Sequence, residues 1–148
     1  MNAFPFANAE WERVKDAAHP VVQARLEDDD AVGESMFIRL QETLHELRCK
    51  YGEHPVLLET EADFCDDPDD AIPLYAKALN LAQQNSLPTV SICLSYAHSL
   101  DEQRKVEEAM IVLESCREQV YADGDLSERE DYEELTTLLS SRNRDPIR

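Results

Sequence analysis

Three residues that could bind a metal ion lie close together in the sequence. His45 and Cys49 are four residues apart, so a helix would place their side chains on one face, and His54 follows shortly after. No fourth ligand stands at a conventional zinc spacing, and Leu44 and Leu47 put this segment on an apolar packing stripe. We therefore expect no metal and no other cofactor here, with a metal-binding protein as an alternative.

Residues for covalent or acid–base catalysis show no distinctive arrangement. Cys93 and His98 are five residues apart and would point away from each other on a helix. With 32 acidic residues in the chain, pairs of carboxylates are inevitable and carry no information. Glycine-rich phosphate loops and the motifs GxSxG and HExxH are absent from the sequence. We expect that the protein is not an enzyme, and a helical enzyme belongs with the metal-binding alternative.

The distribution of acidic residues is more informative. Seven acids and no base occur between positions 59 and 70, and four more acids are consecutive at 27–30. The seven are Glu59, Glu61, Asp63, Asp66, Asp67, Asp69 and Asp70. Such a run is typical of a solvated surface with acids at helix starts. The functional interpretation is a surface that attracts and holds a basic partner.

Composition limits the class of protein and of partner. The chain has 148 residues, which favours a single domain, and its 14 basic and 32 acidic residues give a net charge of −18. This charge opposes direct binding to nucleic acids or to anionic membranes, because both need lysine and arginine. The first residues lack the pattern of a secretory signal, and no apolar run is long enough to span a bilayer. We therefore expect a cytoplasmic protein.

The four cysteines are spread singly through the sequence. Cys49, Cys65, Cys93 and Cys116 form no CxxC pair, and each lies within or at the end of an amphipathic pattern. We expect four free thiols that pack as small apolar side chains, with two disulfides as the alternative.

Apolar residues recur with the period of a helix almost throughout. One narrow stripe runs over 37–51 and ends at Gly52, for which we expect a left-handed C-terminal cap. A second stripe runs over 106–120 and ends at Gly124. The segment 71–82 has apolar residues on two adjoining faces, which predicts a central helix. Only 3 glycines occur in the chain, which further disfavours a β-rich fold.

Helix starts are also marked in the sequence. Asp67 before Pro68 indicates an N-cap and a first helical residue, and Asn8 can cap a helix that Pro20 then kinks or ends. Two capping boxes are predicted, at Ser99 with Glu102 and at Ser127 with Glu130. The last helix, about 128–142, should present Tyr132, Leu135, Leu138 and Leu139 inward and end in Arg142 and Arg144. In total we expect six to eight helices and no strand.

Two predicted helical hairpins, at 54–82 and 87–116, share a pattern. The second helix of the first hairpin carries Ala71, Tyr75 and Ala78, and the second helix of the second hairpin carries Ala109, Leu113 and Cys116 at the same spacing. The sequence KVEEA at 105–109 begins the second helix of the second hairpin. In the first helix of that hairpin, Tyr96 and Ala97 form a pair of one large and one small residue. Over about 52–121 the chain resembles the tetratricopeptide repeat (TPR) family. In the second hairpin Ala97 lies twelve residues before Ala109, which is the spacing in the family. In the first hairpin Ala62 lies only nine residues before Ala71. Either the loop of the first hairpin is three residues short, or the close contact between its two helices is lost.

The resemblance implies an all-α fold of stacked antiparallel hairpins, as a short TPR-like superhelix or bundle with a C-terminal capping helix. We expect one helical domain over 1–148, with N-terminal helices at 8–51, two TPR-like hairpins at 54–121 and the capping helix at 127–142. In the family, the inner face of the hairpins binds peptide segments. On this chain that face would include Glu53, Thr60, Asp63, Phe64, Leu94 and His98.

These observations predict a non-enzymatic interaction protein, an acidic TPR-like adaptor or chaperone that binds a segment of a basic partner protein. Asp63 and Asp66 are expected to attract that partner and Phe64 to anchor it, with apolar contacts around Val90 and Leu94 as the alternative surface. A second alternative is an immunity protein or antitoxin that neutralises a basic toxin by charge mimicry. Self-association is compatible with all of these hypotheses.

Overall fold

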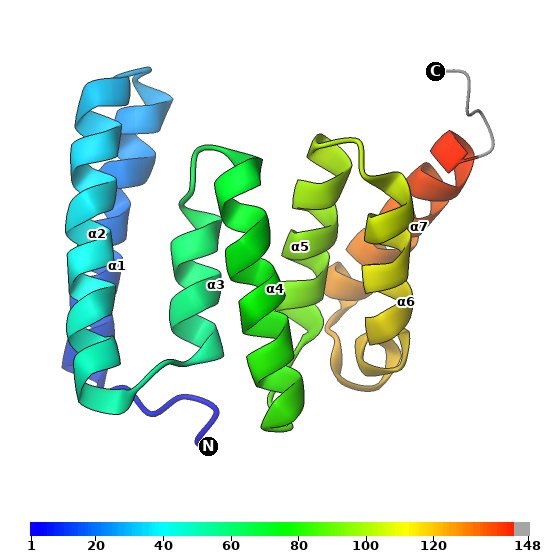
Figure 1. Ribbon diagram of the computed structural model, residues 1–148, viewed down its shortest axis with the longest axis horizontal. Coiled ribbons are helices and arrows are strands. Elements are labelled where there is room, and N and C mark those ends of the chain that lie inside the picture. The colour runs from blue at the N-terminus through cyan, green and yellow to red at the C-terminus, as the bar shows by residue number, and fades with distance from the viewer. Residues whose placement is uncertain (144–148) are drawn as a thin grey trace.

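The computed structural model describes residues 1–143, and within them the chain forms seven α-helices and no strand (Figure 1). This confirms the all-α prediction. The helices are α1 (Asn8–Leu26), α2 (Asp30–Tyr51), α3 (Pro55–Asp63), α4 (Pro68–Gln84), α5 (Val90–Glu102), α6 (Val106–Asp123) and α7 (Leu126–Asn143).

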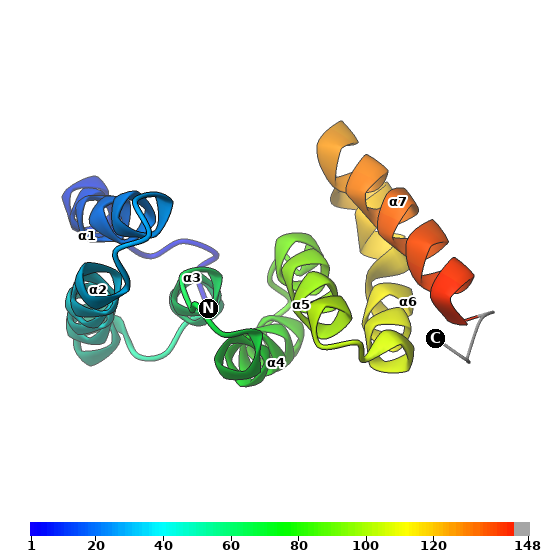
Figure 2. The same cartoon turned by 90° about the horizontal axis from the view of Figure 1, so that it is seen from above.

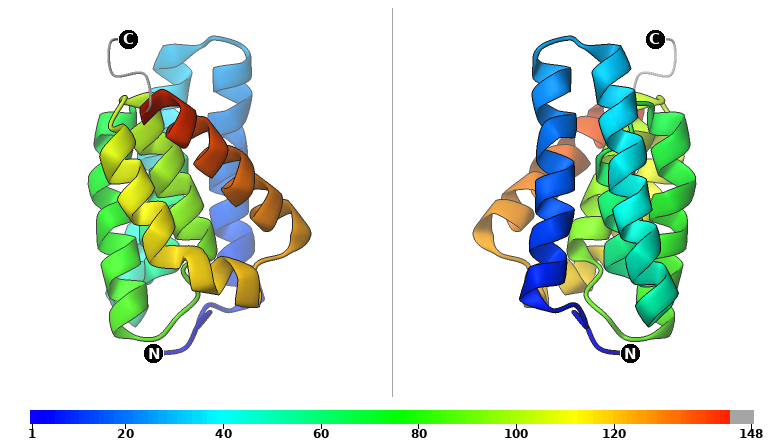
Figure 3. Two further views of the ribbon diagram at one scale, coloured as in Figure 1. Left: turned by 90° about the vertical axis from the view of Figure 1, so that its right-hand side faces the viewer. Right: turned by 90° about the vertical axis from the view of Figure 1, so that its left-hand side faces the viewer.

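The helices pack as consecutive antiparallel pairs. The hairpins α1/α2, α3/α4 and α5/α6 follow one another along the long axis of the molecule (Figures 1 and 2). At the far end α7 crosses the last hairpin obliquely and packs on both α5 and α6 (Figure 3). The structure therefore has the predicted stacked hairpins with a C-terminal helix that covers the last pair.

Two hydrophobic cores hold this stack together. The first core lies in the α1/α2 hairpin and consists of Phe6, Val14, Ala18, Val21, Leu40, Leu44, Leu47 and Leu57. The second core runs from α3 to α7. Helix α3 belongs to both, because its Leu57 packs into the first core while Leu58 and Ala62 pack into the second. Full burial of one such leucine stabilises the fold by about 1.5–3 kcal/mol.

The predicted start of α4 is confirmed, and two other predicted starts are wrong. Asp67 caps α4 by accepting the N–H of Asp69 at 2.9 Å, and Pro68 is the first helical residue. Ser99 lies inside α5, because the apolar period continues through the buried Leu100. At the start of α7, the Asp125 carboxylate accepts the N–H of Glu128, and the Glu128 carboxylate accepts the N–H of Asp125. This pair forms a capping box in place of the one predicted at Ser127.

Helix α1 differs from the prediction in how it begins. Ala7, not Asn8, is its N-cap residue, and the Glu10 carboxylate accepts the Ala7 N–H at 2.8 Å. The helix passes through Pro20 and continues to Leu26, so the proline does not end it.

In α7, Leu138 is 43% exposed and does not point inward as predicted. Arg144 lies outside the described residues.

Helix ends use positive backbone angles, but mostly without glycine. Gly52 has a positive φ of +83°, but its ψ of 179° lies outside the left-handed helical conformation that was predicted. Gly124 is extended, and a Cβ there would collide with the Val120 carbonyl oxygen. Asp28, Ser86 and Arg104 have positive φ angles between 54° and 58°. Each follows a helix and closes it with the paired backbone hydrogen bonds of a Schellman motif.

The residues of the predicted repeat pattern are buried, except Tyr96, which is partly buried. Ala71, Tyr75 and Ala78 of α4 lie in the second core together with Ala109, Leu113 and Cys116 of α6. Ala62 is also buried, so the close contact of the first pair is kept. The nine-residue spacing arises because α3 has only 9 residues against 13 in α5, and the loop that follows α3 is not shortened.

Candidate functional site

A groove forms where a long helix lies beside a short one. Helix α2 has 22 residues and is about 33 Å long, whereas α3 has 9 residues and is about 14 Å long. Because α3 ends early, the N-terminal half of α2 extends beyond it, as Figure 1 shows. The two helices contact each other only sparsely, unlike α4 and α5. This half of α2 therefore faces the start of α4 across an open space.

We call this space the α2–α4 groove; it has a volume of about 720 Å³. Its apolar lining consists of Gly33, Phe37, Ile38, Cys65, Pro73 and Leu74. Its polar lining consists of Asp30, Glu34, Glu61, Asp66, Asp67 and Asp70 with Arg25 and Gln41. Ile38 is 49% exposed, so its apolar surface is open to a ligand. The lining thus combines an apolar floor with acidic walls.

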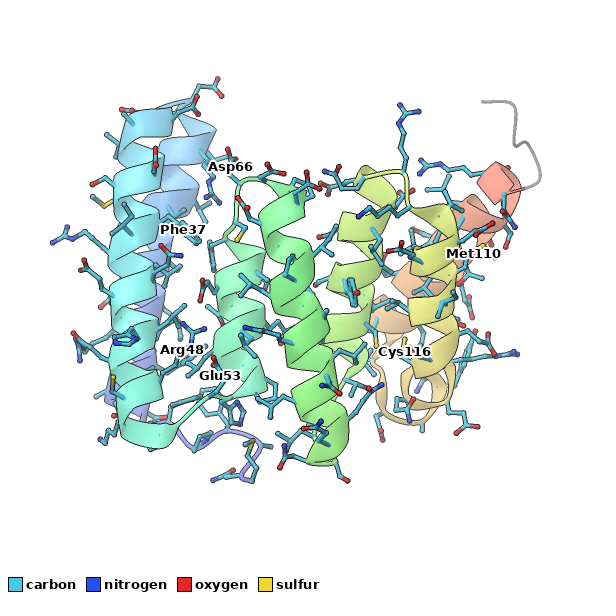
Figure 4. All side chains as sticks on the ribbon, in the orientation of Figure 1. Phe37, Arg48, Glu53, Asp66, Met110 and Cys116 are labelled. Atoms are coloured by element: carbon cyan, nitrogen blue, oxygen red, sulfur yellow. The ribbon has the colours of Figure 1, made fainter. Side chains whose placement is uncertain are left out.

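One end of the groove is closed by a polar clasp between α2 and α3. The Arg48 guanidinium donates to Glu53 at 2.9 Å and to Glu61 at 2.8 Å, and the Gln41 amide donates to Glu61 at 3.2 Å. Burial lowers the pKa of Arg48, but its two carboxylate partners outweigh this and raise the pKa. Figure 4 labels Arg48 and Glu53 at this lower end and Phe37 and Asp66 toward the upper end. The clasp fixes α3 against α2 where the groove ends.

Arg25 is the one base among the lining residues. A Cβ on Gly33 would lie 3.8 Å from the Arg25 Cγ, so the stem of Arg25 rests against α2. Its guanidinium carbon lies 5.9 Å from the centre of the Phe37 ring, and its Nε lies 3.9 Å from the Asp66 carboxylate. The side chain therefore crosses the groove from α1 toward the α3–α4 turn.

The lining carries a surplus of negative charge. Glu61 is neutralised by Arg48, Asp66 lies near Arg25, and Asp67 caps α4. Asp30, Glu34 and Asp70 make no ion pair within residues 1–143. Carboxylates gathered in a cleft with an apolar floor raise the local concentration of cations. The groove is suited to a ligand that is both cationic and apolar.

The acidic run divides between two faces of the molecule. Asp63 accepts the Tyr75 hydroxyl at 2.5 Å; burial raises its pKa, although this bond opposes the shift. Burial also raises the pKa of Glu59 to about 6, with a further contribution from Asp63, while a hydrogen bond from Ser91 opposes it. These two acids face α4 and α5, whereas Glu61 and Asp66 face α2 and α1. The seven acids therefore do not form one surface.

The predicted partner-binding residues are dispersed. Asp66 lines the α2–α4 groove, and Glu53 belongs to the clasp that closes it. Phe64 packs against the first core. The Thr60 hydroxyl donates to the Val56 carbonyl at 2.7 Å within α3.

The other predicted partner-binding residues lie toward α5 and α7. Val90 and Leu94 are buried at 7% and 5% exposure. His98 lies 2.8 Å from Asp131 of α7, and Asp63 is bound to Tyr75. The structure thus brings Asp66 and Glu53 to opposite ends of one groove and places the remaining six elsewhere.

The sequence contained a weak signal for the apolar floor. Leu74 belongs to the second apolar face of the segment 71–82, and it is the member of that face that lines the groove. Ile38 follows Phe37 just off the buried stripe of α2. No pattern in the sequence indicated that Arg25 lines the groove. Its position there depends on how the end of α1 packs near Phe37 and Asp66, which are distant from it in the sequence.

Metal, disulfide and membrane features are absent from the part of the chain that the structure describes. His45 lies 3.5 Å from the Cys49 sulfur, and no third ligand joins them or forms another such group. The four cysteines are unbridged: Cys93 and Cys116 are buried, Cys65 is partly buried, and Cys49 is exposed, contrary to the expected packing. No helix between residues 1 and 143 is long and apolar enough to cross a membrane.

Because comparisons with known proteins found no match, the functional proposal is based on the geometry of the α2–α4 groove. No family model, curated protein or solved structure was found to match this chain. The α2–α4 groove is the feature with the most specific chemistry.

Proposed function

We propose that the protein is a non-enzymatic interaction module, a small TPR-like adaptor or chaperone that binds a basic, amphipathic segment of another protein. The observation that carries the proposal is the α2–α4 groove, with its exposed apolar floor and its surplus of carboxylates. The similarity of the hairpins to a peptide-binding repeat family supports the same kind of function.

The shape and chemistry of the groove favour an amphipathic helix as the bound segment. Its volume of about 720 Å³ can accept a few side chains, not a whole domain. A helix laid in a groove presents apolar residues on one face, and these would rest on Ile38 and Leu74. Lysine and arginine beside that face would then meet Glu34 and Asp66 on the walls. Both parts of the lining are used by such a ligand.

A designed peptide tests this proposal without knowledge of the natural partner. The probe is a fluorescently labelled amphipathic helix with leucine on one face and lysine and arginine beside it, titrated into the full chain. A control peptide carries glutamate in place of every base. We expect binding of the basic peptide only, with an association rate that falls as salt is raised, because salt screens long-range attraction.

Charge variants separate the groove from the general acidity of the chain. Glu34→Gln with Asp66→Asn removes two charges from the groove, and Glu114→Gln with Glu118→Gln removes two from exposed positions on α6. We expect the groove variant to slow association about threefold or more and the α6 variant to have a much smaller effect. Equal effects of the two pairs would contradict the proposed site.

Apolar variants test the floor. Ile38→Ala should speed dissociation, because a short-range apolar contact acts mainly on the off-rate. The matched control is Ile111→Ala on α6, since Ile111 is 69% exposed and lies outside the groove. An unchanged dissociation rate for Ile38→Ala would count against the groove.

A further inference from the structure

Arg25 already places a guanidinium inside the groove. Its side chain is only 28% exposed, with the stem against Gly33 and the guanidinium over the Phe37 ring. Gly33 and Phe37 are four residues apart on α2, so they form one continuous strip along a single helix face. Together with Asp66, this strip surrounds the guanidinium with an aromatic face and a carboxylate.

An aromatic face beside a carboxylate is the combination that recognises arginine. The planar guanidinium stacks on an aromatic ring, and its fork of N–H groups matches the two oxygens of a carboxylate. Arg25 uses only part of this chemistry. Its Nε lies 3.9 Å from Asp66, longer than the roughly 2.8 Å of a charge-assisted hydrogen bond, and Asp66 is 87% exposed. The carboxylate is therefore free to accept a better-placed donor.

We propose that Phe37 and Asp66 form an arginine subsite of the groove, which Arg25 fills in the free chain and an arginine of the bound segment fills in the complex. The inference rests on the proposed function of the groove and names the residue that its partner must carry. Arg25 thus acts as an internal competitor that the partner displaces.

The surroundings of Arg25 allow it to leave. Arg25 lies in the last turn of α1, where the helix dipole favours a positive charge. This holds whether its guanidinium lies over Phe37 or has moved toward solvent. The turn that follows begins the acidic run 27–30, so the displaced guanidinium would meet carboxylates as it moves toward solvent. The neighbouring Leu26 is 76% exposed, which shows that the chain is open to solvent here.

The test is the affinity of the basic peptide for Arg25→Ala compared with Arg13→Ala. Both substitutions remove one positive charge from α1, but Arg13 pairs with Glu46 outside the groove. We expect Arg25→Ala to bind a peptide with a central arginine about threefold more tightly than Arg13→Ala does, since a competing stacked cation is gone. For a peptide with lysine in place of the central arginine, the gain in affinity from Arg25→Ala should be smaller. When both chains also carry Asp66→Asn, this gain in affinity should disappear.

The outcomes distinguish this inference from the proposed function. If the peptide binds the wild-type chain and Ile38→Ala weakens binding, but Arg25→Ala equals Arg13→Ala or binds more weakly, the arginine subsite is wrong and the groove stands. If neither the wild-type chain nor Arg25→Ala binds the peptide, both proposals are wrong. Circular dichroism of each variant confirms that the compared chains are folded.

Discussion

Glu59 is an acid that the fold holds partly out of water, beside Asp63 and close enough to Glu128 for that charge to act on it. Its pKa of about 6 lies above the ordinary value of 4.5. The folded state therefore binds a proton more readily than the unfolded chain, and the ionised carboxylate costs stability at neutral pH. The contribution of this group to stability improves as pH falls from about 6 toward 4.5.

We predict that Glu59→Gln raises the free energy of unfolding at pH 7 by up to about 2 kcal/mol, because a neutral amide of similar shape avoids the cost of burying a charge. Denaturant unfolding at pH 7 and again near pH 4 measures this, and the gain should nearly vanish at the lower pH, which lies below both pKa values. Glu118→Gln on α6 is the exposed control. A gain that is equal at both pH values would show that charge burial is not its cause.

His54 connects the N-terminal segment to the start of α3. Its Nδ1 accepts the N–H of Val56 at 3.1 Å, so the proton lies on Nε2, which donates to the Asn2 carbonyl at 2.8 Å. The ring is 3% exposed and lies edge-on to Phe6. One side chain thus caps a helix and holds the terminus over the first core.

We predict that His54→Ala lowers the free energy of unfolding by about 2 kcal/mol, since both a helix cap and a buried hydrogen bond are lost. His45→Ala, on the outer face of α2, should change it by less than about 0.5 kcal/mol. Urea unfolding of the two variants provides the comparison. Equal effects would mean that the His54 bonds contribute little.

At the scale of the helices, α7 depends on a few buried side chains. Leu139 is fully buried in the second core, whereas its neighbour Leu138 is 43% exposed. We predict that Leu139→Ala lowers the free energy of unfolding by about 2–5 kcal/mol and Leu138→Ala by less than about 1 kcal/mol. Thermal or urea unfolding checks the pair. Similar losses would contradict the position of α7 on the last hairpin.

The turn between α5 and α6 contains a residue in an unfavourable conformation. Arg104 has φ +58°, in the left-handed region that side chains with a Cβ rarely adopt. We predict that Arg104→Gly raises the free energy of unfolding by about 0.5–1 kcal/mol, because relief of this strain exceeds the added entropy of the unfolded chain. Lys105→Gly, the next residue in the turn at φ −92°, should not stabilise the chain. Chemical denaturation of both variants measures the difference.

The sequence predicted those helices whose signals are strong and local. The stripes over 37–51 and 106–120 and the Asp67–Pro68 start are all present in the structure. Ser99 and Ser127 failed as starts because the apolar period of α5 runs past one and Asp125 provides a better cap beside the other. The ends at Asp28, Ser86 and Arg104 could not be predicted, since they lack the glycine that usually marks such turns.

At the scale of the whole molecule, the two cores described within residues 1–143 meet at α3. Leu57 and Leu58 are adjacent in sequence yet belong to different cores. Because α3 is so short, the α1/α2 hairpin is supported along only part of its length, and the α2–α4 groove occupies the rest. No local pattern encodes this arrangement. The sequence therefore showed an acidic run that contains Asp66, but not the groove that gathers Asp66 with Phe37, Ile38 and Leu74.

Peptide binding in the α2–α4 groove is tested most directly by amide chemical-shift mapping of the ¹⁵N-labelled full chain titrated with the basic amphipathic peptide. We expect shift changes concentrated at the groove, with Gly33, Phe37 and Leu74 among the largest and the exposed face of α6 unchanged. Changes concentrated on α5 and α7, around Leu94 and Asp131, would contradict it. So would small changes spread over every acidic surface, which is the pattern expected of charge mimicry.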